Sequence, residues 1–172
     1  MNGTETDKLL AKIAKGDNSA FEQLYIKTRN GVYAFLYSYL KNAHDTEDAM
    51  QTVYLKVKMN ISSYKIGTNG RAWLLQIAKN HAITLLQKRN RTIMEENSKQ
   101  PDLFARGEIM DIMRRCLNED EIQIVTLHVL WGYKHREISR QLGMPLGTVT
   151  SKYKRSIDKM RKALKEVRDE KV

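Results

Sequence analysis

Hydroxyl and cationic side chains gather on one face of a predicted helix within the segment Glu119–Lys165. Residues three and four apart lie on the same side of a helix, which places these groups together. Hydroxyls and cations at such spacing can hydrogen-bond to base edges in a major groove and to the flanking phosphates. The pattern predicts contact with double-stranded DNA, and the alternative is an ordinary amphipathic hairpin with a solvated basic face. The residues of this face are Thr148, Thr150, Ser151, Lys154 and Arg155.

The residues before and within this face predict a helix-turn-helix. Ile138 and Leu142, four apart, turn one side of a short first helix inward, and Ser139 is small enough for a second helix to approach closely. Gly143 can take the left-handed conformation that ends a helix. Pro145 stops the first helix and fits the start of the second. The second helix carries a narrow apolar stripe of Val149, Tyr153, Ile157 and Met160 or Leu164.

Acidic and amide side chains gather at the start of another predicted helix, at Asp45, Glu47, Asp48 and Gln51. Asp45 can cap this helix, and carboxylates near a helix N-terminus interact favourably with the helix dipole. Asp48 and Gln51, three apart, share an outward face that is open to a partner. His44 stands beside these acids, but no second histidine lies at ligand spacing, so we expect no metal site.

The composition predicts an all-helical protein that meets a polyanion. The 172 residues are 41% hydrophobic and 29% charged, with 2 prolines, 9 glycines and a net charge of +10. Few turn residues favour helices, and a strongly basic small protein commonly binds nucleic acid. We expect the single cysteine, Cys116, to be a small buried residue rather than a nucleophile. No apolar run is long enough for a signal peptide or a membrane span, so we expect a soluble, cytoplasmic protein.

Apolar stripes and the breaks between them predict two small helical domains joined by a flexible linker. The stripes predict helices from about Ser19 to Tyr39, from Asp45 to Ile61 and from Arg71 to about Arg91. A polar, proline-containing segment follows and predicts the linker. The expected domains are residues 1–93 and 108–172, with the linker at residues 94–107.

Three segments resemble, in the right order, signatures of bacterial sigma factors of the sigma-70 family, in its extracytoplasmic-function group. Asp45–Val57 (DTEDAMQTVYLKV) resembles the region 2 signature, and Trp73–Asn80 (WLLQIAKN) resembles the motif W-L-x-x-I-A-x-N that follows it. Gly143–Lys152 (GMPLGTVTSK) resembles the region 4 signature. The resemblance covers nearly all of the chain.

The resemblance implies a promoter-specificity subunit that is not an enzyme and needs no cofactor. Such a subunit binds core RNA polymerase, at the clamp coiled coil of the largest subunit and the flap of the second-largest. It recognises promoter DNA at the −10 and −35 elements and assists opening. Its two domains lack the larger middle domain of housekeeping sigma factors, and its linker threads toward the active-site and RNA exit channels. An anti-sigma factor holds many members of the family and is a candidate partner.

The resemblance also implies which residues make these contacts. The loop Ser62–Gly70 would capture a flipped base, since opened bases can be held by stacking and by hydrogen bonds. Tyr64 either stacks on such a base or packs at the base of the loop, and Trp73 is either a core residue or a base platform. The core-polymerase contact is assigned to Asp45, Glu47, Asp48 and Gln51. The −10 element is assigned to Lys56, Ser62, Ser63, Tyr64, Lys65, Lys79 and Asn80. The −35 element is assigned to Thr148, Thr150, Ser151, Lys152, Lys154 and Arg155.

The sequence departs from the family pattern at four positions. Thr84 stands where an aspartate is common, and Gln87 stands where an arginine is common. Thr150 replaces a lysine or arginine, which removes a guanine or phosphate contact from the predicted recognition helix. Lys152 replaces an arginine, which exchanges a bidentate fork for a point charge.

Two other classes of function remain as alternatives. A free-standing helix-turn-helix regulator would bind duplex DNA tightly by itself, but Asp45–Val57 and Ser62–Gly70 favour the sigma-factor hypothesis. An enzyme is disfavoured because the sequence has no HExxH motif, no phosphate-binding glycine loop and no triad, and its four histidines are scattered.

Overall fold

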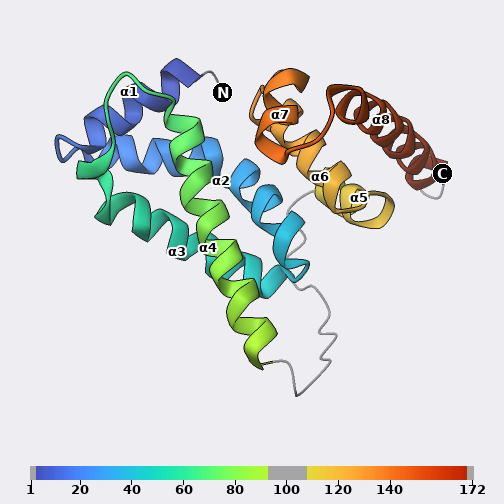
Figure 1. Ribbon diagram of the computed structural model, residues 1–172, viewed down its shortest axis with the longest axis horizontal. Coiled ribbons are helices and arrows are strands. Elements are labelled where there is room, and N and C mark those ends of the chain that lie inside the picture. The colour runs from blue at the N-terminus through green and yellow to red at the C-terminus, as the bar shows by residue number, and fades with distance from the viewer. Residues whose placement is uncertain (1–2, 93–107, 170–172) are drawn as a thin grey trace. The chain divides into compact units, whose positions relative to one another are not determined.

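The computed structural model describes residues 3–92 and 108–169, and all regular secondary structure in these two ranges is helical (Figure 1). The predicted all-α fold is therefore confirmed. The described helices fall into two compact units, one on each side of the gap. The predicted domain bounds stay predictions, and the predicted linker, residues 94–107, lies outside the described residues.

The first unit is built around a long central helix. Its elements are α1 (Gly3–Ile13), α2 (Asn18–Leu40), α3 (Ala43–Met59), the short 3-10 turn η1 (Ile61–Ser63) and α4 (Gly70–Thr92). α2 packs against the three other α-helices, and α3 and α4 also pack on each other (Figure 1). Large apolar side chains fill the space between them, among them Leu24, Phe35, Leu36, Val53 and Leu74.

α1 is a helix that the sequence analysis did not predict. Leu9, Leu10 and Ile13 are buried where α1 packs against α2 and α4. The buried set also includes Thr6, a polar residue that breaks the apolar stripe. A helix of 11 residues with so short a stripe gives a weak periodic signal.

The N-cap of α3 lies three residues earlier than predicted. Asn42 is its N-cap, and the Asn42 side chain accepts a hydrogen bond from the Asp45 N–H at 3.0 Å. Lys41, with φ 56°, ends α2 in the left-handed conformation, and Ala43 is already buried. The prediction that Asp45 caps the helix is therefore wrong. Asp45 lies in the first turn, where its negative charge still interacts favourably with the helix dipole.

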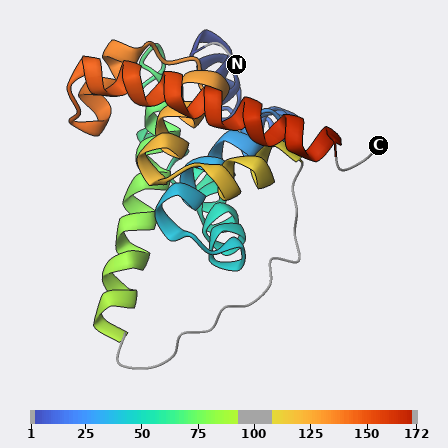
Figure 2. The same cartoon turned by 90° about the vertical axis from the view of Figure 1, so that its right-hand side faces the viewer.

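The second unit is smaller and is organised by its last helix. Its elements are α5 (Glu108–Cys116), α6 (Glu119–Val125), the π-helical turn η2 (Thr126–Leu130), α7 (His135–Leu142) and α8 (Leu146–Asp169). α8 lies across α5, α6 and α7 (Figure 2). The apolar core includes Ile122, Ile124, Leu127, Ile138 and Val149. Cys116 is only half-buried, although it was expected to be buried.

The turn between α7 and α8 has the predicted chemistry. Gly143 ends α7 in the left-handed conformation, with φ 67°. The Ser139 hydroxyl donates a hydrogen bond to the Met144 carbonyl at 2.6 Å, which ties the turn to the first helix. The Pro145 carbonyl accepts the Val149 N–H at 3.1 Å, so proline stands directly before the second helix. The helix-turn-helix prediction is thus confirmed in its local geometry.

Candidate functional site

The acidic face at the start of α3 surrounds a hollow between three helices. Asp45, Asp48 and Gln51 are exposed, and Glu47 is half-buried. The Asp45 carboxylate lies 3.9 Å from Arg89 of α4, and the Asp48 carboxylate lies 3.4 Å from His44. The hollow, of about 450 Å³, is lined by Leu40, Asn42, Asp45, Asp48, Leu85, Leu86 and Arg89.

This arrangement leaves the carboxylates available to a partner. Both contacts are exposed to solvent, where such contacts contribute little stability and exchange easily. Leu85 and Leu86, both half-buried, supply apolar surface beneath the acidic rim. A basic partner segment with an apolar anchor would match both features.

The loop between α3 and α4 separates its predicted site residues into two groups. Ser62, Ser63 and Lys65 are exposed, whereas Tyr64 is only 5% exposed. The Tyr64 ring centroid lies 5.2 Å from that of Trp73. The loop therefore presents its hydroxyls and its lysine outward and turns its aromatic ring inward.

Tyr64 is a packing residue in this structure. Its hydroxyl donates a hydrogen bond to Asp7 of α1 at 2.6 Å. Burial, together with this bond, raises the pKa of Tyr64 to about 12. The buried ring fits the expected role of packing at the base of the loop, and the expected stacking on a base stays a prediction. Trp73 is half-buried against the Tyr64 ring.

A groove between α3 and α4 brings two of the predicted residues together. Lys56 and Asn80 both line it, and its volume is about 530 Å³. The Lys56 ammonium lies 3.2 Å from Nδ1 of His81, and Asn80 Oδ1 accepts a hydrogen bond from Gln76 at 2.7 Å. Lys79 is half-buried and does not line this groove. The lining residues are Thr52, Leu55, Lys56, Met59, Asn60, Ile77 and Asn80.

The groove also has an apolar rim that the sequence analysis missed. Leu55 is 62% exposed and Met59 is 79% exposed. They lie four residues apart on α3, outside its buried stripe, and that spacing was the available signal. Burial and the nearby charges of Lys56 and Lys88 lower the pKa of His81, which contacts Lys56 of the groove.

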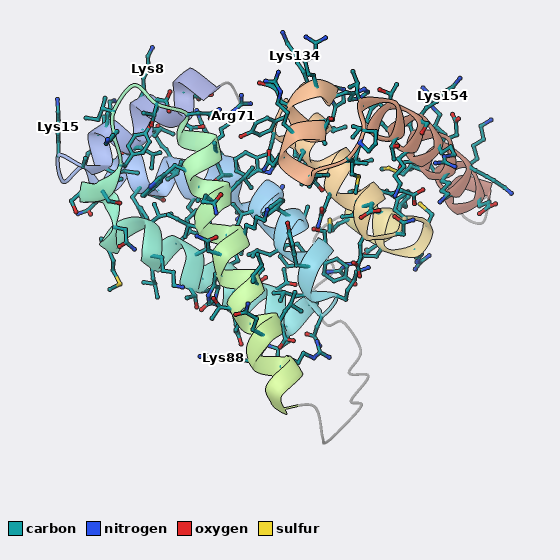
Figure 3. The ribbon with its side chains drawn as sticks, in the orientation of Figure 1. Lys8, Lys15, Arg71, Lys88, Lys134 and Lys154 are labelled. Carbon is teal, nitrogen blue, oxygen red and sulfur yellow. The ribbon has the colours of Figure 1, made fainter. Side chains whose placement is uncertain are left out.

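The predicted recognition face lies on α8. Thr150, Ser151, Lys154 and Arg155 are exposed, and Thr148 is half-buried. Lys154 projects outward from the helix (Figure 3). The structure therefore brings most of the predicted −35 residues to one exposed surface.

Lys152 and Thr150 are held within the unit. The Lys152 ammonium donates a hydrogen bond to Asp120 of α6 at 2.5 Å, and only 23% of the Lys152 side chain is exposed. The Thr150 hydroxyl lies 3.0 Å from the Leu146 carbonyl and 3.3 Å from Nδ1 of His135. The Thr150 hydroxyl is therefore already engaged within the unit, and the methyl group is the part of this side chain that is not.

Behind the recognition face, polar residues that the sequence analysis missed join α8 to the rest of the unit. Glu121, 4% exposed, accepts two hydrogen bonds from Lys159 at 2.8 and 2.9 Å. The rings of His128, His135 and Tyr153 form a cluster with centroid separations of 4.6 to 4.9 Å. The contacts of Lys159 and Tyr153 of α8 join residues 18 to 38 positions apart, which explains why local spacing gave no signal.

Two family models match the two units separately. The model of sigma-70 region 2 matches residues 24–92, and that of sigma-70 region 4 matches residues 110–160. Together they span well over half of the chain. The chain belongs to the sigma-70 family, in its extracytoplasmic-function group. Sigma factors are non-catalytic subunits that direct RNA polymerase to promoters.

Similar proteins extend the comparison over more than nine-tenths of the chain. The chain is 23% identical over 191 residues to the extracytoplasmic-function sigma factor SigW of Bacillus subtilis (strain 168), covering 93% of this chain and 97% of SigW. It is 24% identical over 176 residues to SigK of Mycobacterium bovis (strain BCG / Pasteur 1173P2), covering 94% of each. Both relatives are matched over nearly their whole length.

Two solved structures share the fold. RpoE of Bartonella quintana, in complex with the anti-sigma factor NepR, has a TM-score of 0.58 at 21% identity, covering 84% of this chain and 96% of RpoE. CnrH, in complex with the cytosolic domain of CnrY, has a TM-score of 0.57 at 17% identity, covering 94% of this chain and 98% of CnrH. Within residues 3–92 and 108–169, no helix is long and apolar enough to cross a membrane.

Proposed function

We propose that the two units of this sigma factor contact two promoter elements, and that the first unit also docks on the polymerase. The observation that carries the proposal is the exposed face of α8, where Thr150, Ser151, Lys154 and Arg155 stand on the second helix of a helix-turn-helix. In this motif the second helix enters the major groove and the turn sets its angle. The −35 element is the duplex that this face contacts.

Lys154 and Arg155 contact phosphates or guanines, and Ser151 hydrogen-bonds to a base edge or phosphate. Thr150 contributes differently, because its hydroxyl already has two partners inside the unit. Its methyl group fits against the methyl group of a thymine. Lys152 acts mainly through its pair with Asp120, which orients α8.

The first unit contacts the −10 element with the loop after α3 and the adjoining groove. Ser62, Ser63 and Lys65 are exposed on the loop, and Lys56 and Asn80 line the groove. Opened DNA offers base edges to amides and hydroxyls and offers phosphates to ammonium groups. Lys79 is half-buried on α4, the helix that also carries Asn80, and adds positive charge there.

The polymerase docks on the acidic face of α3. Asp48 and Gln51 are exposed side by side, with Asp45 and Glu47 beside them. The clamp coiled coil of the largest subunit is the partner of this face, and the flap of the second-largest subunit is the partner of the second unit. The protein acts in the cytoplasm, where the polymerase is.

Run-off transcription with purified core polymerase on genomic fragments tests the proposal. We expect initiation at defined start sites whose upstream sequences share two elements. Asp48→Ala should lose core binding, whereas Glu22→Ala, which removes an exposed carboxylate from α2, should not. No initiation on any fragment together with no core binding would contradict the proposal.

A gel shift without core polymerase separates this proposal from a free-standing regulator. A sigma factor should bind duplex promoter DNA poorly until it joins the polymerase. Tight binding of the isolated chain to its mapped promoter would favour the regulator instead.

An anti-sigma factor is a further proposed partner. The sigma factor RpoE, which has the same fold, is seen with the anti-sigma factor NepR, and CnrH is seen with the cytosolic domain of CnrY. We expect the chain isolated from uninduced native cells to carry one small protein that competes with purified core polymerase. Isolation of the chain bound only to polymerase, under every growth condition, would count against this partner.

A further inference from the structure

One side chain of α1 holds both ends of the loop that precedes α4. Oδ1 of Asp7 accepts a hydrogen bond from the Tyr64 hydroxyl at 2.6 Å and another from the Gly70 N–H at 2.5 Å. Tyr64 follows η1 directly, and Gly70 is the first residue of α4. The exposed stretch between these anchors, residues 65–69, contains Lys65 of the proposed −10 surface.

The approach of α1 to Gly70 is as close as a backbone allows. A Cβ atom on Gly70 would lie 2.7 Å from Oδ1 of Asp7 and 2.8 Å from Cδ1 of Leu10. Any larger residue would displace the Asp7 carboxylate and the Leu10 side chain from these positions. The Gly70 N–H belongs to the first turn of α4, where backbone donors lack a partner within the helix and where negative charge is favourable. Asn69 is the local N-cap of α4, because its side chain accepts the Ala72 N–H at 3.1 Å. Asp7 adds a second acceptor from another helix, which satisfies the Gly70 N–H.

The loop has few other restraints. Within it, the Thr68 hydroxyl and N–H both bond to the Lys65 carbonyl, at 2.7 and 3.2 Å. These contacts shape a local turn but do not connect it to another helix. Ile66 is 63% exposed, so the loop buries little apolar surface there. Asn69 caps α4 at the end of the loop, and the Tyr64 ring packs against Trp73 of α4, so these contacts connect the loop to α4. The Asp7 carboxylate is the group that hydrogen-bonds both ends of the loop to α1.

We propose that Asp7 is a positioning residue for recognition of the −10 element. By holding Tyr64 and Gly70, it sets the angle at which the loop presents Lys65 and the neighbouring Ser62 and Ser63 to the opened strand. The inference rests on the proposed function of this loop. It also goes beyond the family match, because α1 lies outside residues 24–92, which the region 2 model covers.

The first arm of the test measures hydrogen exchange of the backbone amides of residues 65–70 in the full chain. Asp7→Ala removes both hydrogen bonds, and we expect faster exchange of the Gly70 amide and its neighbours. Asp7→Asn keeps an oxygen that can accept both bonds, so we expect protection close to that of the parent chain. Glu5→Ala is the matched control, because it removes an exposed carboxylate of α1 that pairs with Lys27. The control should leave the loop amides unchanged.

The second arm measures binding by holoenzyme reconstituted with core polymerase. The probes are a single-stranded non-template oligonucleotide and a duplex, which carry the −10 and −35 elements mapped by run-off transcription. We expect Asp7→Ala to weaken binding to the oligonucleotide about tenfold, as for loss of two hydrogen bonds, with unchanged affinity for the duplex and for core. Asp7→Asn should restore most of the loss. A general loss of stability would weaken all three affinities together and would not be rescued in this selective way.

Tyr64→Phe keeps the test decisive if Asp7→Ala does not fold. It removes one of the two hydrogen bonds and keeps the buried ring, so a smaller weakening of oligonucleotide binding is expected. The proposal is overturned if the loop amides of both variants exchange as in the parent, or if exchange rises while oligonucleotide binding stays unchanged. An equal effect of Glu5→Ala would also overturn it. Failure of the proposed function is distinct, because the parent holoenzyme itself would then initiate nowhere.

Discussion

The two units of this sigma factor are held together by different interactions. In the first unit, the ion pairs Glu5–Lys27 and Asp45–Arg89 lie on the surface. Its helices meet through apolar side chains together with hydrogen bonds of tyrosine hydroxyls, Tyr54 with Thr28 and Tyr64 with Asp7. In the second unit, Lys159 pairs with the buried Glu121, and Lys152 pairs with Asp120. Both of these pairs join α6 to α8, the helix that carries the proposed recognition face. The stability of the second unit and the orientation of its DNA-binding helix therefore depend on the same charges.

The largest expected effect is the loss of an aromatic side chain from the first unit. Phe35 is 1% exposed, and its ring lies 5.3 Å from that of Tyr39 between centroids. Phe35→Ala should cost about 3–5 kcal/mol of unfolding free energy, because it removes apolar contacts and leaves a cavity. The cost should fall on the first unit only.

The two tryptophans allow this selectivity to be measured. Trp73 lies in the first unit and Trp131 in the second, so single-tryptophan variants report urea unfolding of each unit by fluorescence. Phe35→Ala should shift the Trp73 transition and leave the Trp131 transition in place. An equal shift of both transitions would mean that the units unfold together, and the comparison would fail.

The buried carboxylate of the second unit should give the next largest effect. The Glu121 carboxylate accepts a hydrogen bond from the Lys159 ammonium and another, at 3.0 Å, from the Asn118 N–H. With Asn118 it forms the capping box of α6. Glu121→Ala should cost about 1–3 kcal/mol, as for loss of a charged hydrogen-bond partner and a cap. Asp158→Ala, which removes an exposed carboxylate of α8, is the matched control. The Trp131 transition measures both.

Glu121 also predicts a response to acid. Burial alone would raise its pKa, but hydrogen bonds from Lys159 and Asn118 lower the pKa below its ordinary value. The folded unit therefore binds this proton less readily than the unfolded chain does, and stability falls as the pH drops below the ordinary carboxyl range. Glu121→Gln should flatten that part of the pH profile, and an unchanged profile would contradict this assignment.

Neighbouring lysines on α8 should separate DNA contact from support of the unit. Lys154→Ala should weaken binding of holoenzyme to the −35 duplex about tenfold and reduce the salt dependence by about one counterion. Lys152→Ala should instead lower the stability of the second unit by about 1 kcal/mol, because it breaks the pair with Asp120. Core binding should be spared in both variants. If Lys152→Ala reduces DNA binding more than Lys154→Ala, the recognition face has been assigned to the wrong side of the helix.

The sequence predicts the structural features that are determined by residues close together in the chain. The stripes of α2, α3 and α4 and the turn at Gly143 and Pro145 involve residues within a few positions of one another, and the predicted helices and turn are found there. The contacts that it missed join distant residues. Tyr64 is buried because its hydroxyl meets Asp7, 57 positions away. Lys152 turns inward because it meets Asp120, 32 positions away.

Departures from the family pattern can also be understood only with the structure. Thr84 hydrogen-bonds to the Asn80 carbonyl of its own helix at 2.9 Å, so its hydroxyl is engaged on α4. Thr150 is engaged in the same way on α8 and also meets His135. Spacing alone shows that such residues are exposed, but not that their hydroxyl groups already have partners.

The smallest expected effect is a response of each unit to mild acid through one histidine. Burial and the charges of Lys56 and Lys88 lower the pKa of His81 in the first unit, whereas burial and His128 lower that of His135 in the second. A lowered pKa means that the unfolded chain is protonated first as the pH falls through about 6.5, so folding stability is lost below that value.

Substitution should remove this dependence in one unit at a time. The measurement is urea unfolding at about pH 7.5 and about pH 5.5, followed by the fluorescence of each tryptophan. His81→Gln should reduce the change of stability with pH in the first unit, which Trp73 reports, and not in the second. His135→Gln should reduce this change only in the second unit, which Trp131 reports, so each variant is the control for the other.

The structure also gives the two histidines different neighbours. His81 is 3.2 Å from the Lys56 ammonium, whereas His135 is 3.3 Å from the Thr150 hydroxyl. Protonation of His81 should therefore repel the Lys56 ammonium, whereas protonation of His135 should be opposed by His128 and should rearrange the hydrogen bond with Thr150. A larger change of stability with pH in the second unit would show that the ring cluster with His128, not the DNA-facing neighbour, determines the cost.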